Sequence, residues 1–185
     1  MSGVVLPPWP EPAPAHGDVV LRAFTDDDVD VVRELSTDPY VPLVTSLPAA
    51  ATEAQALAWI ERNRGRRDEG TGFSFAIAEA ATGRTVGQVG LWLAELPSGR
   101  ASAGYLVAPG ARGRGFARSA LAAVTAFAWT VPGLHRVQLF VEPSNEASVR
   151  TARGAGYEPE GLLRSYQEIG GRRRDVLVFG AVRQR

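Results

Sequence analysis

The 185-residue sequence contains no cysteine, no lysine and only two histidines, His16 and His135. Without cysteine the chain has no disulfides, no thiolate nucleophile and no cysteine metal site. Two histidines are too few for a histidine cluster, so we predict chemistry without a bound metal. A run of about 18 apolar residues is also missing, which excludes a membrane-spanning helix.

Neither sign of charge is in excess, because 20 basic and 20 acidic side chains give a formal net charge of zero. No global field favours DNA or a membrane surface, and we expect neither as a partner. The first 16 residues carry five prolines and lack the basic and apolar regions of a secretory signal, so we predict a cytoplasmic protein. With 45% hydrophobic residues, we expect one domain over residues 18–185, preceded by a flexible proline-rich tail over residues 1–17.

Hydrophobic periodicity and turn signals predict a mixed sheet with helices on its faces. Thr25 is expected to cap a first helix, whose three leading aspartates suit the positive helix end, and Thr52 with Gln55 forms a capping box for a second. The segment 38–48 carries three prolines and is predicted to be a loop. In order, we predict a strand over 19–24, helices after Thr25 and Thr52, strands around 73–77, around 86–93 and up to 107, a helix over 115–129, a strand over 134–141, a helix over 145–155 and a hairpin over 157–168 and 173–182. This β-α-α-β-β-β-α-β-α-β-β order is of the α/β class, with a mixed α+β sheet.

The segment 105–117 is an apolar strand that runs into glycines and then into a long apolar helix. At such a junction several backbone N–H groups have no partner inside the helix, and the helix dipole favours negative charge. Gly113 and Gly115 keep side chains away from a ligand, while Arg112 and Arg114 add positive charge. The segment is therefore predicted to bind a diphosphate.

The spacing of the glycines decides which kind of phosphate loop this is. A dinucleotide-binding loop requires Gly-x-Gly-x-x-Gly, but the third glycine position holds Arg118, and a P-loop requires a lysine that the chain lacks. The remaining pattern, Arg-x-x-Gly-x-Ala from Arg112 to Ala117, resembles the acetyl-coenzyme A loop of the GNAT family of N-acetyltransferases. The alternative is a solvated Arg-Gly loop without a ligand, or a weak nucleic-acid contact.

A second region is similar to the RimJ/RimL-like branch of the same family. It contains Val-Glu-Pro-Ser-Asn-Glu-Ala-Ser at 141–148, Gly-Ala-Gly-Tyr at 154–157 and Glu-Gly-Leu-Leu-Arg at 160–164, together with matches at 104–105 and 134–136. The similarity extends from about residue 19 to 182. It implies a GNAT fold in which the strands ending at 107 and 141 splay apart, with acetyl-coenzyme A in the wedge between them. The residues that we assign to this cofactor are Leu106, Val107, Arg112, Gly113, Arg114, Gly115, Phe116, Ala117, Asn145 and Ser148.

The resemblance also suggests how the acetyl group is transferred. It implies that a backbone N–H near Val107 polarises the thioester carbonyl, and the absence of cysteine favours direct attack by the amine. Many family members carry a tyrosine four residues after the serine of the second motif, where this chain has Ala152. The candidate catalytic residues are therefore Ser148, or water, as acid and Glu168 as base.

Each of these roles has an alternative. Ser148 is otherwise an ordinary small residue in the first turn of a helix, and Glu168 is otherwise a solvated carboxylate. Gln167 is the other candidate for the equivalent of the base. Trp92 and Tyr105 are expected mainly to be aromatic side chains that stabilise the sheet, and only secondarily to line the substrate pocket.

The sequence thus predicts an N-acetyltransferase that moves an acetyl group from acetyl-coenzyme A to a primary amine, such as a protein N-terminal α-amine. The alternatives are a small-molecule amine as acceptor (an aminoglycoside, a polyamine or an amino acid) and a non-catalytic acyl-coenzyme A sensor. The arginine run 172–174 is either a solvated part of the hairpin or a contact for an acidic peptide, a phosphate or ribosomal RNA. The C-terminal hairpin also offers a sheet edge that allows a homodimer.

Overall fold

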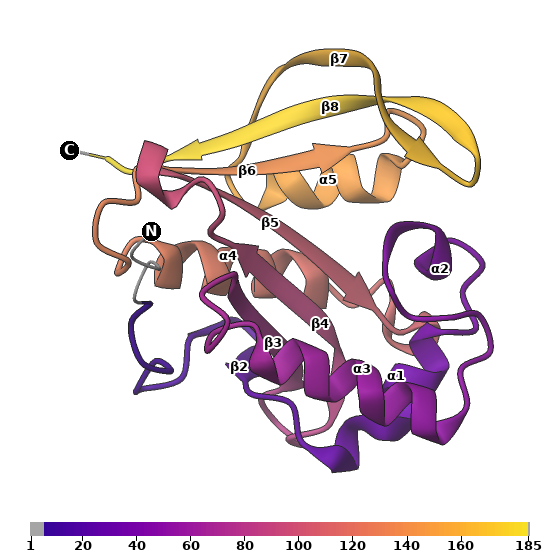
Figure 1. The fold of residues 1–185 in the computed structure, drawn as a ribbon. Helices are drawn as coiled ribbons and strands as arrows, with labels where there is room; N and C mark the ends of the chain where they lie inside the picture. The colour runs from indigo at the N-terminus through magenta and orange to yellow at the C-terminus, as the bar shows by residue number, and fades with distance from the viewer. Residues whose placement is uncertain (1–5, 185) are drawn as a thin grey trace.

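The structure, a computed structural model, describes residues 6–184. Within this range the chain forms an eight-stranded sheet with helices on both faces (Figure 1). The strands are β1 (Ala15–His16), β2 (Val19–Arg22), β3 (Gly72–Glu79), β4 (Thr85–Trp92), β5 (Arg100–Val107), β6 (Arg136–Val141), β7 (Glu158–Ile169) and β8 (Arg172–Val182). The helices are α1 (Val29–Leu35), α2 (Val41–Val44), α3 (Glu53–Gly65), α4 (Phe116–Ala128) and α5 (Glu146–Gly154), with short 3-10 turns at Asp26–Asp28, Leu96–Ser98 and Pro109–Ala111.

The sheet order is β1-β2-β3-β4-β5-β6-β8-β7, and neighbouring strands are antiparallel except for β5 and β6. This mixed α/β arrangement confirms the predicted fold class and the predicted order of the main elements. The capping box at the start of α3 is also confirmed, since the Gln55 backbone N–H donates to Thr52 Oγ1 at 3.3 Å and the Thr52 N–H donates to Gln55 Oε1 at 2.9 Å.

Two local predictions were wrong. The segment 38–48 contains the one-turn helix α2, where Pro42 lies in the first turn and supplies a φ that suits a helix start. The proline-rich segment is not a free tail over residues 6–17, because Leu6 is buried and Trp9 packs edge-on against Phe73 and Phe75, with ring centroids 5.7 and 5.2 Å apart. The prediction for residues 1–5 lies outside the described residues.

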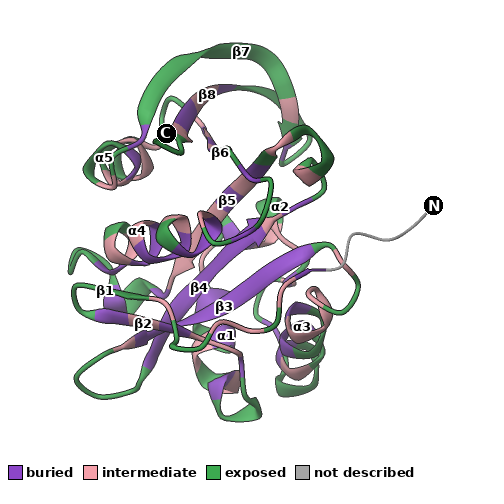
Figure 2. Cartoon of the chain, turned by 90° about the vertical axis from the view of Figure 1, so that its left-hand side faces the viewer, coloured by how far each residue is buried: buried purple, intermediate pink, exposed green. Residues whose placement is uncertain are grey.

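Two apolar clusters hold helices on opposite faces of the sheet (Figure 2). Helix α4 packs on one face, where Phe127 lies edge-on to Phe73 and Phe75 with centroids 4.9 and 5.5 Å apart. Such aromatic pairs stabilise a core by about 0.5–1.5 kcal/mol each beyond their burial. On the other face α1 and α3 pack around Phe24 and Trp59. The helix that follows the glycine loop is therefore firmly fixed to the sheet.

The central strands β5 and β6 separate, as predicted. They pair in parallel at only three positions, Arg100 with Arg136, Ala101 with Val137 and Ser102 with Gln138. Beyond these pairs β5 continues beside β4 as far as Val107, and β6 continues beside β8 as far as Val141. A wedge therefore opens toward the carboxyl ends of the two strands, where α4 and α5 begin.

A buried carboxylate joins the turn before α1 to the sheet. Asp28 is 4% exposed and accepts hydrogen bonds from Arg22 (2.8 Å at each oxygen), the Thr25 N–H (2.8 Å) and Thr85 Oγ1 (2.6 Å). Burial alone raises the pKa of Asp28, but these hydrogen bonds and the Arg22 charge outweigh it and hold the pKa below its usual value. Asp28 is therefore ionised, and its hydrogen bonds connect β2, β4 and the start of α1.

We expect Asp28→Asn to lower the free energy of unfolding at pH 7 by about 3 kcal/mol, because Arg22 loses its buried counter-charge. The folded-state pKa of Asp28 is depressed, so its contribution is present above the unfolded pKa of about 3.9 and is lost as the pH falls through the lower folded value. Urea unfolding at pH 7 and pH 3 measures both effects. The exposed neighbour Asp27→Asn is the control, and an equal loss in the control at pH 7 contradicts the assignment.

Candidate active site

A cavity of about 1290 Å³ occupies the wedge between β5 and β6. It is lined by the loop before α4, the start of α5, the α2 segment and the end of β7. This volume exceeds the roughly 300–1,000 Å³ of an ordinary small-molecule pocket, so it leaves room for two substrates. All but one of the cofactor residues predicted from the sequence lie along it, together with Ser148, Gln167 and Glu168.

The glycine loop has the geometry of an anion cradle. Gly113 and Gly115 have φ of 77° and 83°, a region that favours glycine, and Gly115 is the N-cap of α4. A Cβ built on either residue meets no protein atom within 4 Å. The space beside the loop is therefore open, and the first N–H groups of α4, at Phe116 and Ala117, have no partner within the helix. These features fit a pyrophosphate.

The two loop arginines behave differently from one another. Arg112 lines the cavity, but its Nη2 donates to Asp38 at 2.5 Å and its Nε donates to the Val107 carbonyl at 3.1 Å. Arg114 lies outside the cavity lining, where it pairs with Glu79 and sits 4.6 Å from the centroid of the Phe116 ring. The structure therefore does not bring the Arg114 side chain to the predicted phosphate site.

The pairing of Arg112 also acts on its partner. Burial on its own raises the pKa of Asp38, but hydrogen bonds from Arg112 and from the Tyr40 backbone N–H hold that pKa below its usual value. Asp38 is therefore ionised, and its negative charge balances the positive charge of Arg112. The ion pair also fixes the loop before α4 to the segment before α2.

The backbone of β5 supplies a donor to the wedge. The Ala108 N–H donates to the Val86 carbonyl at 2.9 Å, so Ala108 and Val86 form a hydrogen-bonded pair of the antiparallel ladder between β5 and β4. Such pairs alternate with non-bonded ones, and Val107 lies opposite Gly87 at the next position. The Val107 N–H therefore faces away from β4 and toward the wedge, while the Leu106 N–H is directed at β4.

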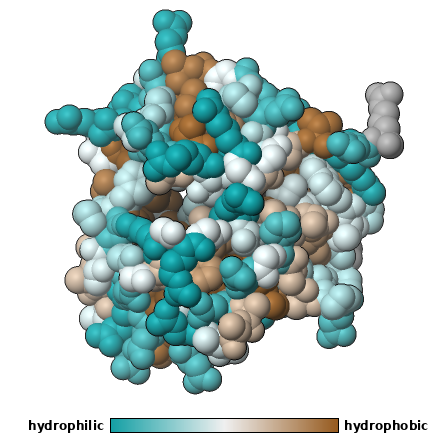
Figure 3. All heavy atoms as spheres, turned by 180° about the vertical axis from the view of Figure 1, so that it is seen from behind, coloured by the Kyte–Doolittle hydropathy of each residue, from teal (hydrophilic) through white to brown (hydrophobic). Residues whose placement is uncertain are grey.

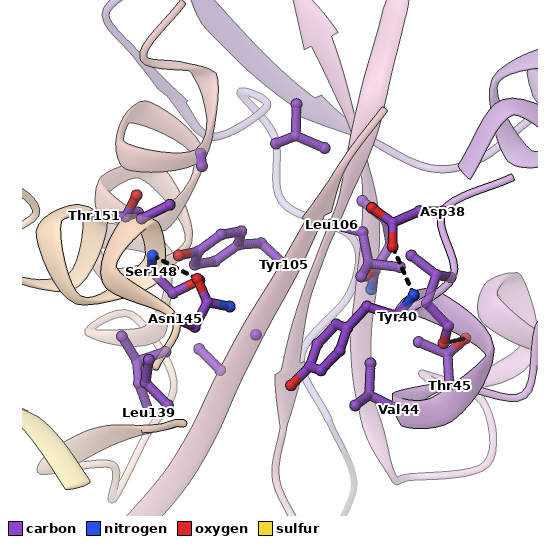
Figure 4. A pocket seen from close by; sticks show the side chains of 18 of the residues that line it. Asp38, Tyr40, Val44, Thr45, Tyr105, Leu106, Leu139, Asn145, Ser148 and Thr151 are labelled. Atoms are coloured by element: carbon purple, nitrogen blue, oxygen red, sulfur yellow. Dashed lines mark hydrogen bonds between the residues drawn. The ribbon is translucent and has the colours of Figure 1, made fainter. Parts of the chain in front are cut away.

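The start of α5 lies across the wedge from β5 (Figure 4). Asn145 caps this helix, as predicted, because its Oδ1 accepts from the Ser148 N–H at 3.0 Å. Its side-chain N–H groups remain available to a ligand. Ser148 is half-buried and lines the cavity, whereas Ala152 is fully buried in the apolar core. Position 152, where the family resemblance would place a tyrosine, is therefore apolar here and belongs to the core.

Sequence reasoning predicted Tyr105 as a sheet aromatic that also lines the substrate pocket, but it did not single out the hydroxyl group. Its ring extends from β5 toward α5, and its hydroxyl end points at the region of Ser148 and Asn145 (Figure 4). The hydroxyl oxygen is buried and has no hydrogen-bond partner among the described residues. The strand alternation that places Ala101 and Ala103 on the α4 face was readable in the sequence and places Tyr105 on the same face.

Sequence reasoning also missed a polar bridge across the cavity. Tyr40 Oη donates to Glu142 Oε1 at 2.7 Å, and Arg174 Nε lies 3.6 Å from Glu142 Oε2. Burial and the neighbouring Glu142 carboxylate raise the pKa of Tyr40 far above its usual value, so Tyr40 remains a hydrogen-bond donor. The bridge joins the segment before α2 to the end of β6 and the start of β8, and no local motif marks it.

The terminal hairpin contributes the remaining candidates. Glu168 is exposed, faces Arg173 in the β7–β8 register and borders the cavity beside Gln167. The arginine run is partly engaged, since Arg174 pairs with Glu142 and Arg173 Nη1 donates to the Tyr166 carbonyl at 3.4 Å. Among residues 6–184, no three His, Cys, Asp or Glu side chains form a group suited to a metal ion. None of the helices described is long and apolar enough to cross a membrane.

Known proteins share this sequence pattern and fold. Residues 18–158 match a family model described as an acetyltransferase (GNAT) domain. An uncharacterized N-acetyltransferase, p20, from Bacillus licheniformis is 28% identical over 166 residues, which cover 90% of this chain and 93% of p20. The solved structure of Mycobacterium smegmatis RimJ in complex with CoA-disulfide is 26% identical, with a TM-score of 0.77 over 92% of this chain and 84% of that one.

A second solved structure shares the fold at a lower sequence identity. A spermidine N-acetyltransferase SpeG chimera from Vibrio cholerae and hSSAT has a TM-score of 0.71 at 22% identity, over 90% of this chain and 96% of that one. Because only 22% of the residues are identical, this likeness concerns the fold alone.

We expect Gly115→Asp to weaken coenzyme A binding about 100-fold or more, which corresponds to about 2.7 kcal/mol. The new side chain fills the open space beside the loop and places a negative charge at the front of α4. Isothermal titration calorimetry measures the affinity. Gly83→Asp is the matched control, because Gly83 also has a positive φ (71°) and an open Cβ position but lies in the β3–β4 turn. Equal binding by both variants contradicts the assignment.

Proposed function

Because the chain belongs to the GNAT family and is an acetyl-coenzyme A-dependent N-acetyltransferase, we propose that its acceptor is the α-amine of a protein N-terminus. Acetyl-coenzyme A and an amine are the two substrates, and the cavity has room for both. The amine attacks the thioester directly, without an acetylated enzyme intermediate.

The balance of charge in the cavity carries this proposal. Its lining includes three carboxylates, Asp38, Glu142 and Glu168, and four arginines, at positions 66, 112, 118 and 150. Two of the carboxylates are already occupied, by Arg112 and by Arg174 with Tyr40. A polyamine or an aminoglycoside carries several positive charges and needs an acidic cleft. This lining favours an acceptor with a single amine.

The rim of the cavity adds apolar contacts. Leu43 and Val44 on α2 are 49% and 40% exposed and line the cavity beside Tyr40. The face seen in Figure 3 likewise mixes hydrophilic and hydrophobic side chains instead of presenting a field of one kind. Exposed apolar side chains at a cavity mouth suit the first residues of a peptide. An α-amine also has a pKa of only about 7.7–8.0, so little help is needed to deprotonate it.

In the proposed reaction, main-chain N–H groups at Gly113, Gly115 and the start of α4 hold the pyrophosphate of acetyl-coenzyme A. The Val107 N–H, which faces the wedge, donates to the thioester carbonyl and stabilises the oxyanion that forms there. The Asn145 amide and the Ser148 hydroxyl, at the start of α5, bind the acetyl-bearing end and the sulfur. Glu168, at the acceptor side, accepts the proton that the attacking amine loses.

We expect a lysine-free peptide with a free N-terminus to release coenzyme A from acetyl-coenzyme A, because it presents one α-amine to the cavity. Release is measured with a thiol reagent, and mass spectrometry locates the added acetyl group. The matched control is the same peptide with its N-terminus already acetylated, which we expect to be inert. Spermidine, an aminoglycoside and free amino acids complete the panel. Turnover of one of these small amines without turnover of any peptide contradicts the proposed acceptor.

We expect Ser148→Ala to lower kcat about tenfold and to change the Kd for coenzyme A less than threefold, because one hydrogen bond to the leaving sulfur, worth about 1.4 kcal/mol, is lost. Steady-state kinetics and calorimetry measure the two constants separately. Ser144→Ala serves as the control, since Ser144 is exposed in the same connection and lies outside the cavity lining. An unchanged kcat for Ser148→Ala removes Ser148 from the reaction.

A further inference from the structure

The sulfur of acetyl-coenzyme A leaves as a thiolate and needs a proton, but the usual position for an acid is occupied by a methyl group. Ala152 is fully buried within the core cluster and offers no polar atom to the wedge. Ser148 lies one turn earlier and does line the cavity. An aliphatic hydroxyl is nevertheless a much weaker acid than a thiol, so its proton is not readily transferred.

Tyr105 places a phenol at the same end of the wedge from the opposite side. Its ring extends from β5 toward the start of α5, near Ser148 and Asn145 (Figure 4). In general, a phenol has a pKa of about 10 and a thiol one of about 8.5, whereas the pKa of bulk water is 15.7. A phenol is therefore the better-matched acid for a thiolate.

The Tyr105 hydroxyl also lacks a hydrogen-bond partner among the described residues, 6–184. Its oxygen is buried, and Tyr105 is one of the residues that line the cavity. A buried polar atom without a partner is disfavoured, and the large majority of such atoms in proteins are satisfied. By contrast, the Tyr157 hydroxyl lies 2.6 Å from Thr125 Oγ1 and that of Tyr40 is bound to Glu142. The Tyr105 hydroxyl is thus available to form a hydrogen bond with a bound substrate.

We propose that the Tyr105 hydroxyl donates the proton that the coenzyme A thiolate requires, in place of the acid missing at Ala152. The amine nitrogen forms a bond to the acetyl carbon, and the carbon–sulfur bond breaks with its electron pair on sulfur. The phenolic proton passes to that sulfur. The base holds the proton released by the amine, and the tyrosinate regains a proton from solvent. The inference rests on the proposed direct attack, but it does not depend on which amine is the acceptor.

The test is Tyr105→Phe, which keeps the ring and removes only the hydroxyl. We expect kcat to fall about 100-fold on whichever amine the wild type acetylates, while the Kd for coenzyme A changes less than threefold. The melting temperature without ligand should be unchanged or higher, because the variant loses an unpaired buried group. Tyr166→Phe is the matched control, since Tyr166 is exposed, stacks on Phe140 and lies outside the cavity lining.

A second measurement needs no acceptor. A hydroxyl that donates to the sulfur stabilises its thiolate form, so the thiol of bound coenzyme A should ionise at a lower pH in the wild type than in Tyr105→Phe. Ultraviolet absorbance of the thiolate reports this titration at saturating protein. If no amine in the panel is acetylated, the proposed function fails, and this titration still decides the role of Tyr105. An unchanged kcat, or identical thiol titrations in wild type and variant, overturns the proposal.

Discussion

The ladder between β5 and β6 stops after three residue pairs, and the whole site depends on where it stops. Beyond these three pairs each strand remains paired on its other side, with β4 and β8 respectively, so the sheet tolerates the gap. Backbone groups of β5 that would otherwise pair with β6 are left facing the wedge, and the Val107 N–H is one of them. The same gap lets the starts of α4 and α5 approach one another, which brings two helix N-termini and one free strand edge to a single cavity.

Local pairing of charge shapes this cavity more than net charge does. Arg112 and Arg174 engage carboxylates contributed by distant parts of the chain, and Arg114 is drawn away from the cavity by Glu79. In the proposed function, phosphate binding therefore depends mainly on main-chain N–H groups and on the dipole of α4, which act whatever the side chains do. The acceptor part has little unpaired negative charge, which limits how many positive charges an acceptor can bring.

The elements with strong local signals were predictable from the sequence. The glycine loop, the capping box at Thr52, the cap at Asn145 and the terminal hairpin are each set by neighbours within a few residues, and the structure has them at the expected places. The division into a tail and a domain was less accurate, because Leu6 is buried in the core and the partly buried Trp9 packs against Phe73 and Phe75, more than 60 positions away. Helix α2 was missed because the prolines of its segment also suit a loop.

The sequence by itself determined the family, the place of the glycine loop before α4 and the presence of alanine at position 152, since each is a matter of residue type at fixed spacing. The tertiary structure alone decided which side chains meet in the cavity. Tyr40 reaches Glu142 across 102 positions of the chain, Arg112 reaches Asp38 across 74, and the Tyr105 hydroxyl extends toward α5 without a partner. Such contacts follow from the register of the sheet and the packing of its helices, and neither is encoded within any short segment.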